Sequence, residues 1–327
     1  MTKAKRTLFL MFAITPLSAM AAAQIRQFEL DYVTRIPTLP PGSRKLRLWI
    51  PVPPSDGQQE ISSLKIKIPF PYELHQDPEY HNRYAYLELV PREAATPIEV
   101  GMKIQVKRRE NRVDLSRPGA PQRDPSELAR SLQPDGRVPL DGVIATLAQE
   151  QTRGLVRPLE KARAIYNYVV STMRYDKSGE GWGRGDALFA CSARRGNCTD
   201  FDALLIGMMR AAGIPARFEI GFPLPADRRE GEIPGYHCWA QFWLDDIGWV
   251  PVDASEAWKN PAKRDYFFGA HDEHRVLFSR GRDIRFNPAQ DGEPLNYFVY
   301  PYAELDGKPF AGLEYKFSFR DLQSKRH

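Results

Sequence analysis

The sequence predicts an α+β protein with a strand-rich front half and a second domain in which helices come before strands. Residues 25 to about 112 contain short runs of alternating apolar and polar residues, separated by turns rich in proline and glycine. From residue 143 onward, segments with helical spacing come first and strand-like segments follow. This order is typical of helices packed beside an antiparallel sheet rather than alternating with its strands.

The front half, residues 24–113, is predicted to form a β-sandwich. Its clearest strand is IEVGMKIQVK, residues 98–107, in which every second residue is apolar. Several such strands joined by turns favour two packed sheets. The polar, proline-bearing residues 114–142 are predicted to be a linker with one short helix, and residues 143–327 to form the second, catalytic domain.

Residues 1–23 have the pattern of a secretory signal peptide: a basic start, an apolar stretch and a run of small residues. We therefore expect the mature protein to be exported, periplasmic or secreted. No integral membrane segment is expected after cleavage, because no later apolar stretch is long enough to span a bilayer. Removing Lys3, Lys5 and Arg6 with this peptide lowers the formal net charge from +5 to +2. The basic cluster KRRENR, residues 107–112, lacks interleaved aromatic residues, so no nucleic-acid partner is expected.

A cysteine stands at the start of a predicted helix in RRGNCTDFDALLIGMMRAAGIPAR, residues 194–217. Asn197 is a good N-cap, Gly213 is suited to the end of the helix, and the segment between them has an apolar stripe headed by Cys198. Cys198 is either a small core residue or a nucleophile whose thiolate gains from the helix dipole. The mature chain has three cysteines, and this odd number leaves at least one thiol without an intramolecular partner.

The segment YHCWAQFWLDDIGWVPVDA, residues 236–254, is predicted to be a β-hairpin that carries a histidine and an aspartate. Cross-strand partners have a constant index sum, and a turn centred near residue 245 would set His237 opposite Asp253 or one step from it. A cysteine nucleophile needs a base within hydrogen-bond reach, and that base needs a third group to orient its ring. Three such residues in this order favour a catalytic site over a core histidine and a turn-forming aspartate.

Three stretches together resemble the bacterial transglutaminase-like superfamily: GNCTDFDALLIGMMRAAGIPAR, GYHCWAQFWLDDIGWVPVD and RDYFFGAHDEHRVLFSRGRDI. The resemblance covers about residues 155–296. It implies a papain-like α+β core in which Cys198 is the nucleophile, His237 the base and Asp253 the orienting acid. The strand-rich front half is similar to the β-domain that often precedes such cores.

The resemblance implies a thiol enzyme that acts on amide bonds of a peptide or protein substrate through an acyl-enzyme. Hydrolysis, by a peptidase or amidase, is the expected reaction. Glutamine acyl transfer (cross-linking) is one alternative, and a non-enzymatic binding or scaffold protein is another. No cofactor and no metal ion are expected, since HDEH, residues 271–274, lacks further ligands. The sequence predicts neither the identity of the substrate nor the oligomeric state.

Some details of the site stay open. Animal transglutaminases bind the oxyanion with a tryptophan upstream of the cysteine, so Trp182 and Tyr175 are candidates here beside the backbone N–H of Cys198. Strand alternation predicts that Cys238 faces away from the site and lies in the core. A Cys191–Cys238 disulfide is compatible with the sequence, which does not show their separation.

Overall fold

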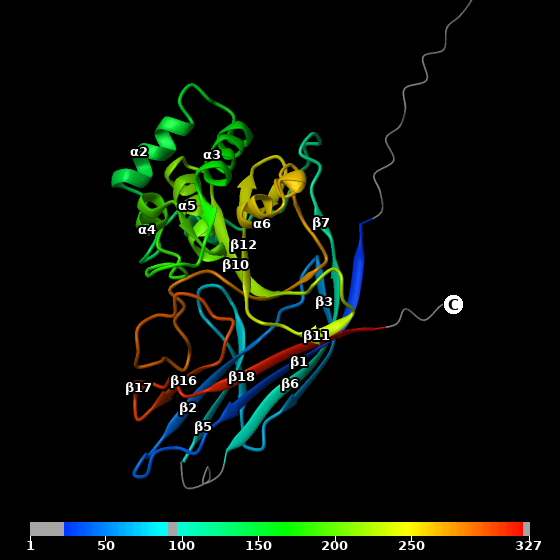
Figure 1. Ribbon diagram of the computed structural model, residues 1–327, viewed down its shortest axis with the longest axis vertical. Helices are drawn as coiled ribbons and strands as arrows, with labels where there is room; N and C mark the ends of the chain where they lie inside the picture. The colour runs from blue at the N-terminus through cyan, green and yellow to red at the C-terminus, as the bar shows by residue number, and fades with distance from the viewer. Residues whose placement is uncertain (1–22, 91–96, 323–327) are drawn as a thin grey trace, which may run out of the picture.

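The computed structural model describes residues 23–90 and 97–322, and Figure 1 shows helices gathered at one end and two large sheets at the other. The predicted α+β class is confirmed. Residues 1–22 of the predicted signal peptide lie outside the described residues. Within residues 23–90 and 97–322, no helix has the length and apolar character needed to cross a bilayer.

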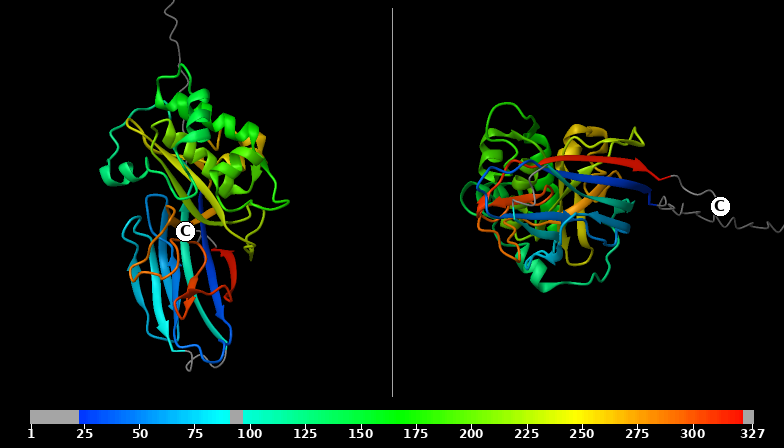
Figure 2. Two further views of the ribbon diagram at one scale, coloured as in Figure 1. Left: turned by 90° about the vertical axis from the view of Figure 1, so that its left-hand side faces the viewer. Right: turned by 90° about the horizontal axis from the view of Figure 1, so that it is seen from below.

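Two five-stranded sheets form the sandwich end of the molecule (Figure 2). The first has the order β11 (Glu230–Glu232), β18 (Glu314–Asp321), β1 (Ile25–Ile36), β6 (Ile98–Arg109) and β3 (Gln59–Lys67). The second has the order β17 (Lys308–Pro309), β16 (Tyr302–Leu305), β2 (Leu46–Val52), β5 (Arg83–Leu89) and β4 (Glu73–Gln76). Alternate residues of β1 and β6 are buried, as the sequence pattern predicts, and both sheets contribute to one hydrophobic core.

The sandwich differs from the predicted domain division because both ends of the described chain build it. The sequence analysis predicts that all of residues 143–327 belong to the second domain. In the structure, however, β18 pairs antiparallel with β1 and β16 pairs antiparallel with β2. Without these partners, one edge of β1 and one edge of β2 would expose unpaired backbone groups. The predicted linker, residues 114–142, contains the short helix α1 (Pro125–Arg130).

The other end of the molecule is organised around one buried helix, α5 (Cys198–Ala211). It begins directly after the predicted N-cap, Asn197, and ends before Gly213, as the sequence predicts. It contacts α2 (Gly142–Gln151), α3 (Pro158–Thr172), α4 (Ala187–Ala193) and α6 (Ala254–Lys259), and a short 3-10 helix (Pro261–Lys263) follows α6. Every residue from Cys198 to Arg210 is buried. A helix enclosed on all sides in this way belongs to the core rather than to the surface.

Helix α5 packs on a four-stranded antiparallel sheet that lies between the helices and the sandwich (Figure 1). Its order is β13 (Gly248–Val252), β12 (His237–Leu244), β10 (Ala216–Pro223) and β15 (Arg275–Arg280). Two short pairs complete the fold: β7 (Asn111–Arg112) with β14 (Ala270–His271), and β8 (Arg174–Tyr175) with β9 (Arg195–Gly196). The predicted hairpin, β12–β13, thus forms one side of this sheet.

Phe317 of β18 joins the sandwich to the four-stranded sheet. Its ring is 3% exposed and lies 4.5 Å from the ring of Tyr32 on β1 and 4.5 Å from the ring of Phe222 on β10, measured between centroids. Tyr32 in turn donates a buried hydrogen bond to the carbonyl of Val299. The C-terminal strand is therefore part of the packing that connects the two halves.

We expect Phe317→Ala to lower the free energy of unfolding by about 3–5 kcal/mol, because it leaves a cavity among buried aromatic rings. Urea denaturation followed by circular dichroism measures this loss. The matched control is Lys316→Ala, next in sequence and solvent-exposed, which should change the stability by no more than about 0.5 kcal/mol. Equal, small effects of both substitutions would contradict the placement of β18 in the core.

Candidate functional site

The start of α5 is built so that Cys198 occupies its first position. Asn197 caps the helix, with its side-chain oxygen accepting from the N–H of Thr199 at 3.0 Å. The carboxylate of Asp200 accepts from the N–H of Asn197 at 2.9 Å, which completes a capping box. Gly196 has φ +152°, and a Cβ there would collide with the Asp200 carboxylate. Only glycine fits immediately before the cap.

Asp200 also fastens the glycine-rich loop that precedes the helix. Its two carboxylate oxygens accept from the N–H groups of Gly183 at 2.7 Å and Gly185 at 3.0 Å. Burial raises the pKa of Asp200, although these backbone donors oppose the shift. The loop and the helix N-terminus thus form one connected unit around Cys198.

The β12–β13 hairpin brings His237 and Asp253 together by a register that differs from the predicted one. Ala240 pairs with Val252 and Leu244 with Gly248, which centres the turn on residue 246. Asp253, just past the end of β13, therefore lies at the level of Trp239, two residues from His237 rather than directly opposite. Because residues two apart share a face of a strand, the side chains still meet diagonally. Nε2 of His237 lies 2.8 Å from Oδ2 of Asp253.

Asp253 is buried, with 0% exposure, and is the acceptor for four neighbouring groups, one of which is the hydroxyl of Ser255 at 3.2 Å. Besides His237, Nη1 of Arg275 donates to it at 3.1 Å and the N–H of Glu256 at 3.0 Å, which makes Asp253 the N-cap of α6. Burial alone would raise the pKa of Asp253, but the charge and hydrogen bond of His237, followed by the charge of Arg275, hold it far below its usual range. Asp253 is therefore ionised.

Cys198 and His237 shift each other's pKa values in opposite directions. Burial opposes both shifts, but the charge and hydrogen bond of Asp253 and contact with Cys198 raise the pKa of His237 to about 10. For the Cys198 thiol, hydrogen bonds from Cys238 and His237 together with the charge of His237 hold the pKa well below its usual range. Since Nε2 of His237 is bonded to Asp253, Nδ1 is the ring nitrogen left for the sulfur. The favoured state at neutral pH is a thiolate beside an imidazolium.

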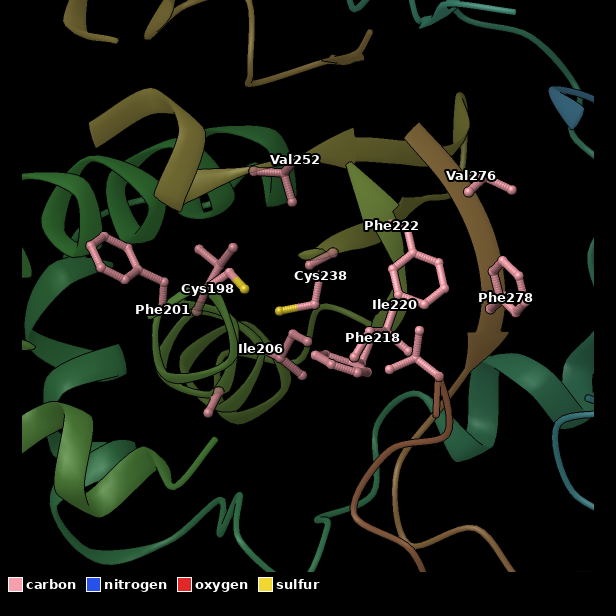
Figure 3. Close-up of a cluster of buried hydrophobic side chains, with 14 of the residues drawn as sticks. Cys198, Phe201, Ile206, Phe218, Ile220, Phe222, Cys238, Val252, Val276 and Phe278 are labelled. Atoms are coloured by element: carbon pink, nitrogen blue, oxygen red, sulfur yellow. The ribbon is translucent and has the colours of Figure 1, made fainter. Parts of the chain in front are cut away.

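The structure corrects the prediction that Cys238 lies away from the site. Cys238 is buried in the core, as expected, and faces the side of β12 opposite to His237. Nevertheless its side chain points toward that of Cys198 (Figure 3), and the two sulfurs influence each other's pKa. The Cys198 sulfur lies near the first residues of β12, so it reaches side chains from both faces of that strand. Cys191, Cys198 and Cys238 are free thiols, and no Cys191–Cys238 disulfide is formed.

The two side chains considered as oxyanion donors differ in their surroundings. The indole N–H of Trp182 donates to the carbonyl of Gly179 at 3.1 Å, so this donor is already engaged within its own loop. Tyr175 lies close enough to Cys198 for the sulfur's charge to act on it: burial, then that charge, raise the pKa of Tyr175 to about 12. The N–H of Cys198, in the first turn of α5, has no intrahelical acceptor.

The histidines of HDEH have separate neighbours. His271 is buried beside Trp239, with 6.0 Å between ring centroids, and burial followed by the charge of Arg275 lowers its pKa to about 3. Nδ1 of His274 lies 3.0 Å from Nη1 of Arg26. Among the described residues, no group of three or more histidine, cysteine or acidic side chains is arranged to hold a metal ion.

Three buried side chains beside the site were not found by sequence reasoning: Arg275, Cys238 as a contact of Cys198, and Asp202. Arg275 follows Asp253 by 22 positions and meets it only through the packing of β15. Asp202 follows Cys198 by four positions, one turn along α5, and this helical spacing is the signal that could have revealed it. No pattern in the sequence around Arg275 indicates that it contacts Asp253.

The comparisons with known proteins concern the same part of the chain. The family described as the transglutaminase-like superfamily matches residues 145–254, a range that includes Cys198, His237 and Asp253. An uncharacterized protein of Haemophilus influenzae is 27% identical over 329 aligned positions, which cover 88% of each chain. The uncharacterized protein YebA of Bacillus subtilis is 24% identical over 134 positions, covering 37% of this chain and 18% of that one.

Among solved structures, the chain is similar to a "Putative Cysteine Protease" from Cytophaga hutchinsonii. The two share 16% sequence identity and a TM-score of 0.61, with 93% of each chain covered. At this identity the likeness concerns the fold, and it extends over the sandwich as well as the helical end. The family match assigns residues 145–254 to the transglutaminase-like superfamily, and the structural likeness shows the fold.

Proposed function

We propose that the protein is a thiol hydrolase that cleaves amide bonds of a peptide or protein through an acyl-enzyme on Cys198. The observation that carries this proposal is the row of buried groups Cys198, His237 and Asp253, in which His237 is hydrogen-bonded to Asp253 and lies close enough to Cys198 to lower the pKa of its thiol. A row of this kind is what an activated sulfur nucleophile requires. A cysteine buried only for packing would need neither the imidazole nor the ionised acid behind it.

The charges of these groups define the steps. The Cys198 thiolate attacks the amide carbonyl, and the carbonyl oxygen becomes an oxyanion facing the N–H of Cys198. The imidazolium of His237 then gives its proton to the departing amine, which leaves a thioester on Cys198. Neutral His237 next takes a proton from water, and the resulting hydroxide releases the acid and restores the thiolate and the imidazolium. Asp253 keeps the ring oriented throughout.

Hydrolysis is the primary assignment because water needs no binding site of its own, whereas acyl transfer requires a place for an acceptor amine and exclusion of water from the thioester. Cys198 and His237 are 2% and 5% exposed, so a substrate carbonyl reaches the sulfur only when neighbouring side chains move. We place the enzyme outside the cytoplasm, periplasmic or secreted, on the basis of the signal-like residues 1–23.

The first prediction concerns the reactivity of Cys198. Iodoacetamide should label it readily at pH 6, where a cysteine with an ordinary pKa of about 8.5 is only about 0.3% thiolate. His237→Ala removes a hydrogen bond and a positive charge from the sulfur, so labelling should begin only at higher pH. Mass analysis of the alkylated peptides measures the labelling of Cys198 in the native protein and in His237→Ala. Cys191 serves as the internal control, since burial raises its pKa. Equal labelling of Cys191 and Cys198 at pH 6 would contradict the proposal.

The second prediction concerns the pKa of His237, followed by NMR of the ring. In the native protein the imidazolium should lose its proton near pH 10, because Asp253 favours the charged form. Asp253→Asn removes that charge while keeping a good N-cap for α6, so the pKa should fall and the rate of amide hydrolysis should fall by about 10²–10⁴-fold.

The matched control for this prediction is Asp272→Asn. Asp272 binds the same Arg275, at 3.2 Å, but is not hydrogen-bonded to His237. Asp272→Asn should therefore change the pKa of His237 less than Asp253→Asn does. A pKa of His237 unaffected by Asp253→Asn would show that Asp253 does not set the charge of the ring.

The third prediction concerns the reaction. When a glutamine-containing peptide is incubated with the enzyme and a primary amine, we expect products that contain added water, from either chain cleavage or deamidation. Mass spectrometry distinguishes these products from an amine adduct, and Cys198→Ala should give none of them. A predominant adduct would reassign the enzyme to acyl transfer. A native protein whose Cys198 is alkylated rapidly but which converts no peptide would instead support the binding or scaffold alternative.

A further inference from the structure

A second thiol faces the proposed nucleophile. Figure 3 shows the side chains of Cys198, at the start of α5, and Cys238, on β12, pointing toward each other. They lie close enough for each sulfur to shift the pKa of the other, and both are free thiols. The steps of amide hydrolysis use His237 and Asp253 but make no use of Cys238. The position of this thiol therefore calls for another explanation.

A buried carboxyl group lies near both sulfur atoms. Asp202 is 0% exposed, and neither of its side-chain oxygens has a partner that meets the distance and angle criteria of a hydrogen bond. It does lie close enough to the Cys238 thiol to act on it electrostatically. A buried carboxyl without a firm partner costs stability, and such a group in a folded protein calls for a chemical role.

The three groups differ in protonation at neutral pH: Cys198 has lost its proton, whereas Cys238 and Asp202 each keep one. Burial and contact with Cys198 raise the pKa of Cys238 well above its usual range, so this sulfur keeps its proton. Burial and the charge of Asp253 likewise raise the pKa of Asp202, so it is a neutral carboxylic acid. A reactive thiolate, a resting thiol and a carboxylic acid thus lie close together. A thiolate of low pKa next to a second thiol is the arrangement in which an oxidised cysteine is resolved to a disulfide.

We propose that Cys238 is a resolving cysteine, which closes a reversible disulfide with Cys198 after a hydroperoxide has oxidised the Cys198 sulfur. This redox site rests on the proposed function, because it needs Cys198 to be the reactive thiolate. The disulfide stops amide hydrolysis by removing the nucleophile. It also protects Cys198 from irreversible oxidation, since sulfinic and sulfonic acids are not restored by ordinary thiols.

The chemistry balances in two steps. The Cys198 thiolate attacks one oxygen of the hydroperoxide, the O–O bond breaks, and with one proton the products are a sulfenic acid on Cys198 and water or an alcohol. The Cys238 sulfur then attacks the sulfenic sulfur, an S–S bond forms, the S–O bond breaks, and the hydroxide leaves as water with the Cys238 proton. Asp202 relays this proton by accepting it on one oxygen and giving its own from the other. Two equivalents of a reducing thiol restore both cysteines.

The test is oxidation of the full-length protein with hydrogen peroxide at neutral pH. Remaining thiols are then alkylated under denaturing conditions, and the peptides are identified by mass. We expect a peptide pair joined through Cys198 and Cys238 with the loss of two hydrogens, Cys191 alkylated, and full recovery of both thiols with dithiothreitol. Cys238→Ala should give no such pair, and its Cys198 should gain two or three oxygens at low peroxide concentration.

Two further variants sharpen the result. Cys191→Ser should form the Cys198–Cys238 disulfide as the native protein does, and Asp202→Asn should form it more slowly because the proton relay is lost. Circular dichroism establishes that each variant is folded. Equal over-oxidation of Cys198 in the native protein and in Cys238→Ala would overturn the proposal, and so would a disulfide that joins Cys191.

The mass measurement does not depend on amide hydrolysis, so the two proposals fail separately. If the oxidised protein forms the Cys198–Cys238 disulfide but the reduced protein cleaves no amide, the redox site is supported and the proposed function is contradicted. If the protein hydrolyses amides but its Cys198 is over-oxidised without forming the disulfide, the proposed function is supported and the redox site is contradicted.

Discussion

The ionised carboxylate of Asp253, completely removed from solvent, is the group on which the rest of the site depends. A buried carboxylate is tolerated only when it is paired and hydrogen-bonded, and Asp253 has His237 and Arg275 as charged partners. Because Asp253 keeps its charge, the imidazole of His237 is favoured in its protonated form. Because that imidazole is protonated, the sulfur of Cys198 is favoured as a thiolate. Charges of opposite sign therefore alternate from Arg275 to Cys198.

The four charged groups of this row come from four separate parts of the fold. Arg275 begins β15, His237 begins β12, Asp253 follows β13, and Cys198 begins α5. Each therefore stands at an end of its element, where one end of the four-stranded sheet meets the N-terminus of the central helix. That N-terminus adds a partial positive charge of its own next to the sulfur. The sandwich is connected to this sheet through Phe317 and Phe222, and β10, which carries Phe222, is the direct neighbour of β12.

Features set by neighbours in the sequence could be predicted, whereas features set by packing could not. The helix that begins at Cys198 is predicted from its N-cap residue and from Gly213, and both lie next to the helix in the sequence. The hairpin is also local, but its turn centres on residue 246 instead of 245, and the sequence of the turn does not fix that difference. The pairing of β18 with β1 joins the two ends of the described chain, and no local pattern reports it. The same is true of the contact between Arg275 and Asp253.

Cys238 illustrates a further limit. Strand alternation predicts correctly that Cys238 and His237 lie on opposite faces of β12. It does not predict where the tip of α5 meets that strand, and the sulfur of Cys198 meets it near the first residues, where both faces are within reach. Side-chain direction follows from local geometry, but the identity of the neighbour follows from how helix and sheet are packed.

The most direct test of this account is the ultraviolet absorbance of the Cys198 thiolate, taken as the difference between the native protein and Cys198→Ser across a pH titration. The account predicts that this thiolate absorbance is already present at pH 6, well below the ordinary cysteine pKa of about 8.5. Absorbance that appears only near or above that ordinary value would contradict it, because Cys198 would then be a neutral thiol at physiological pH.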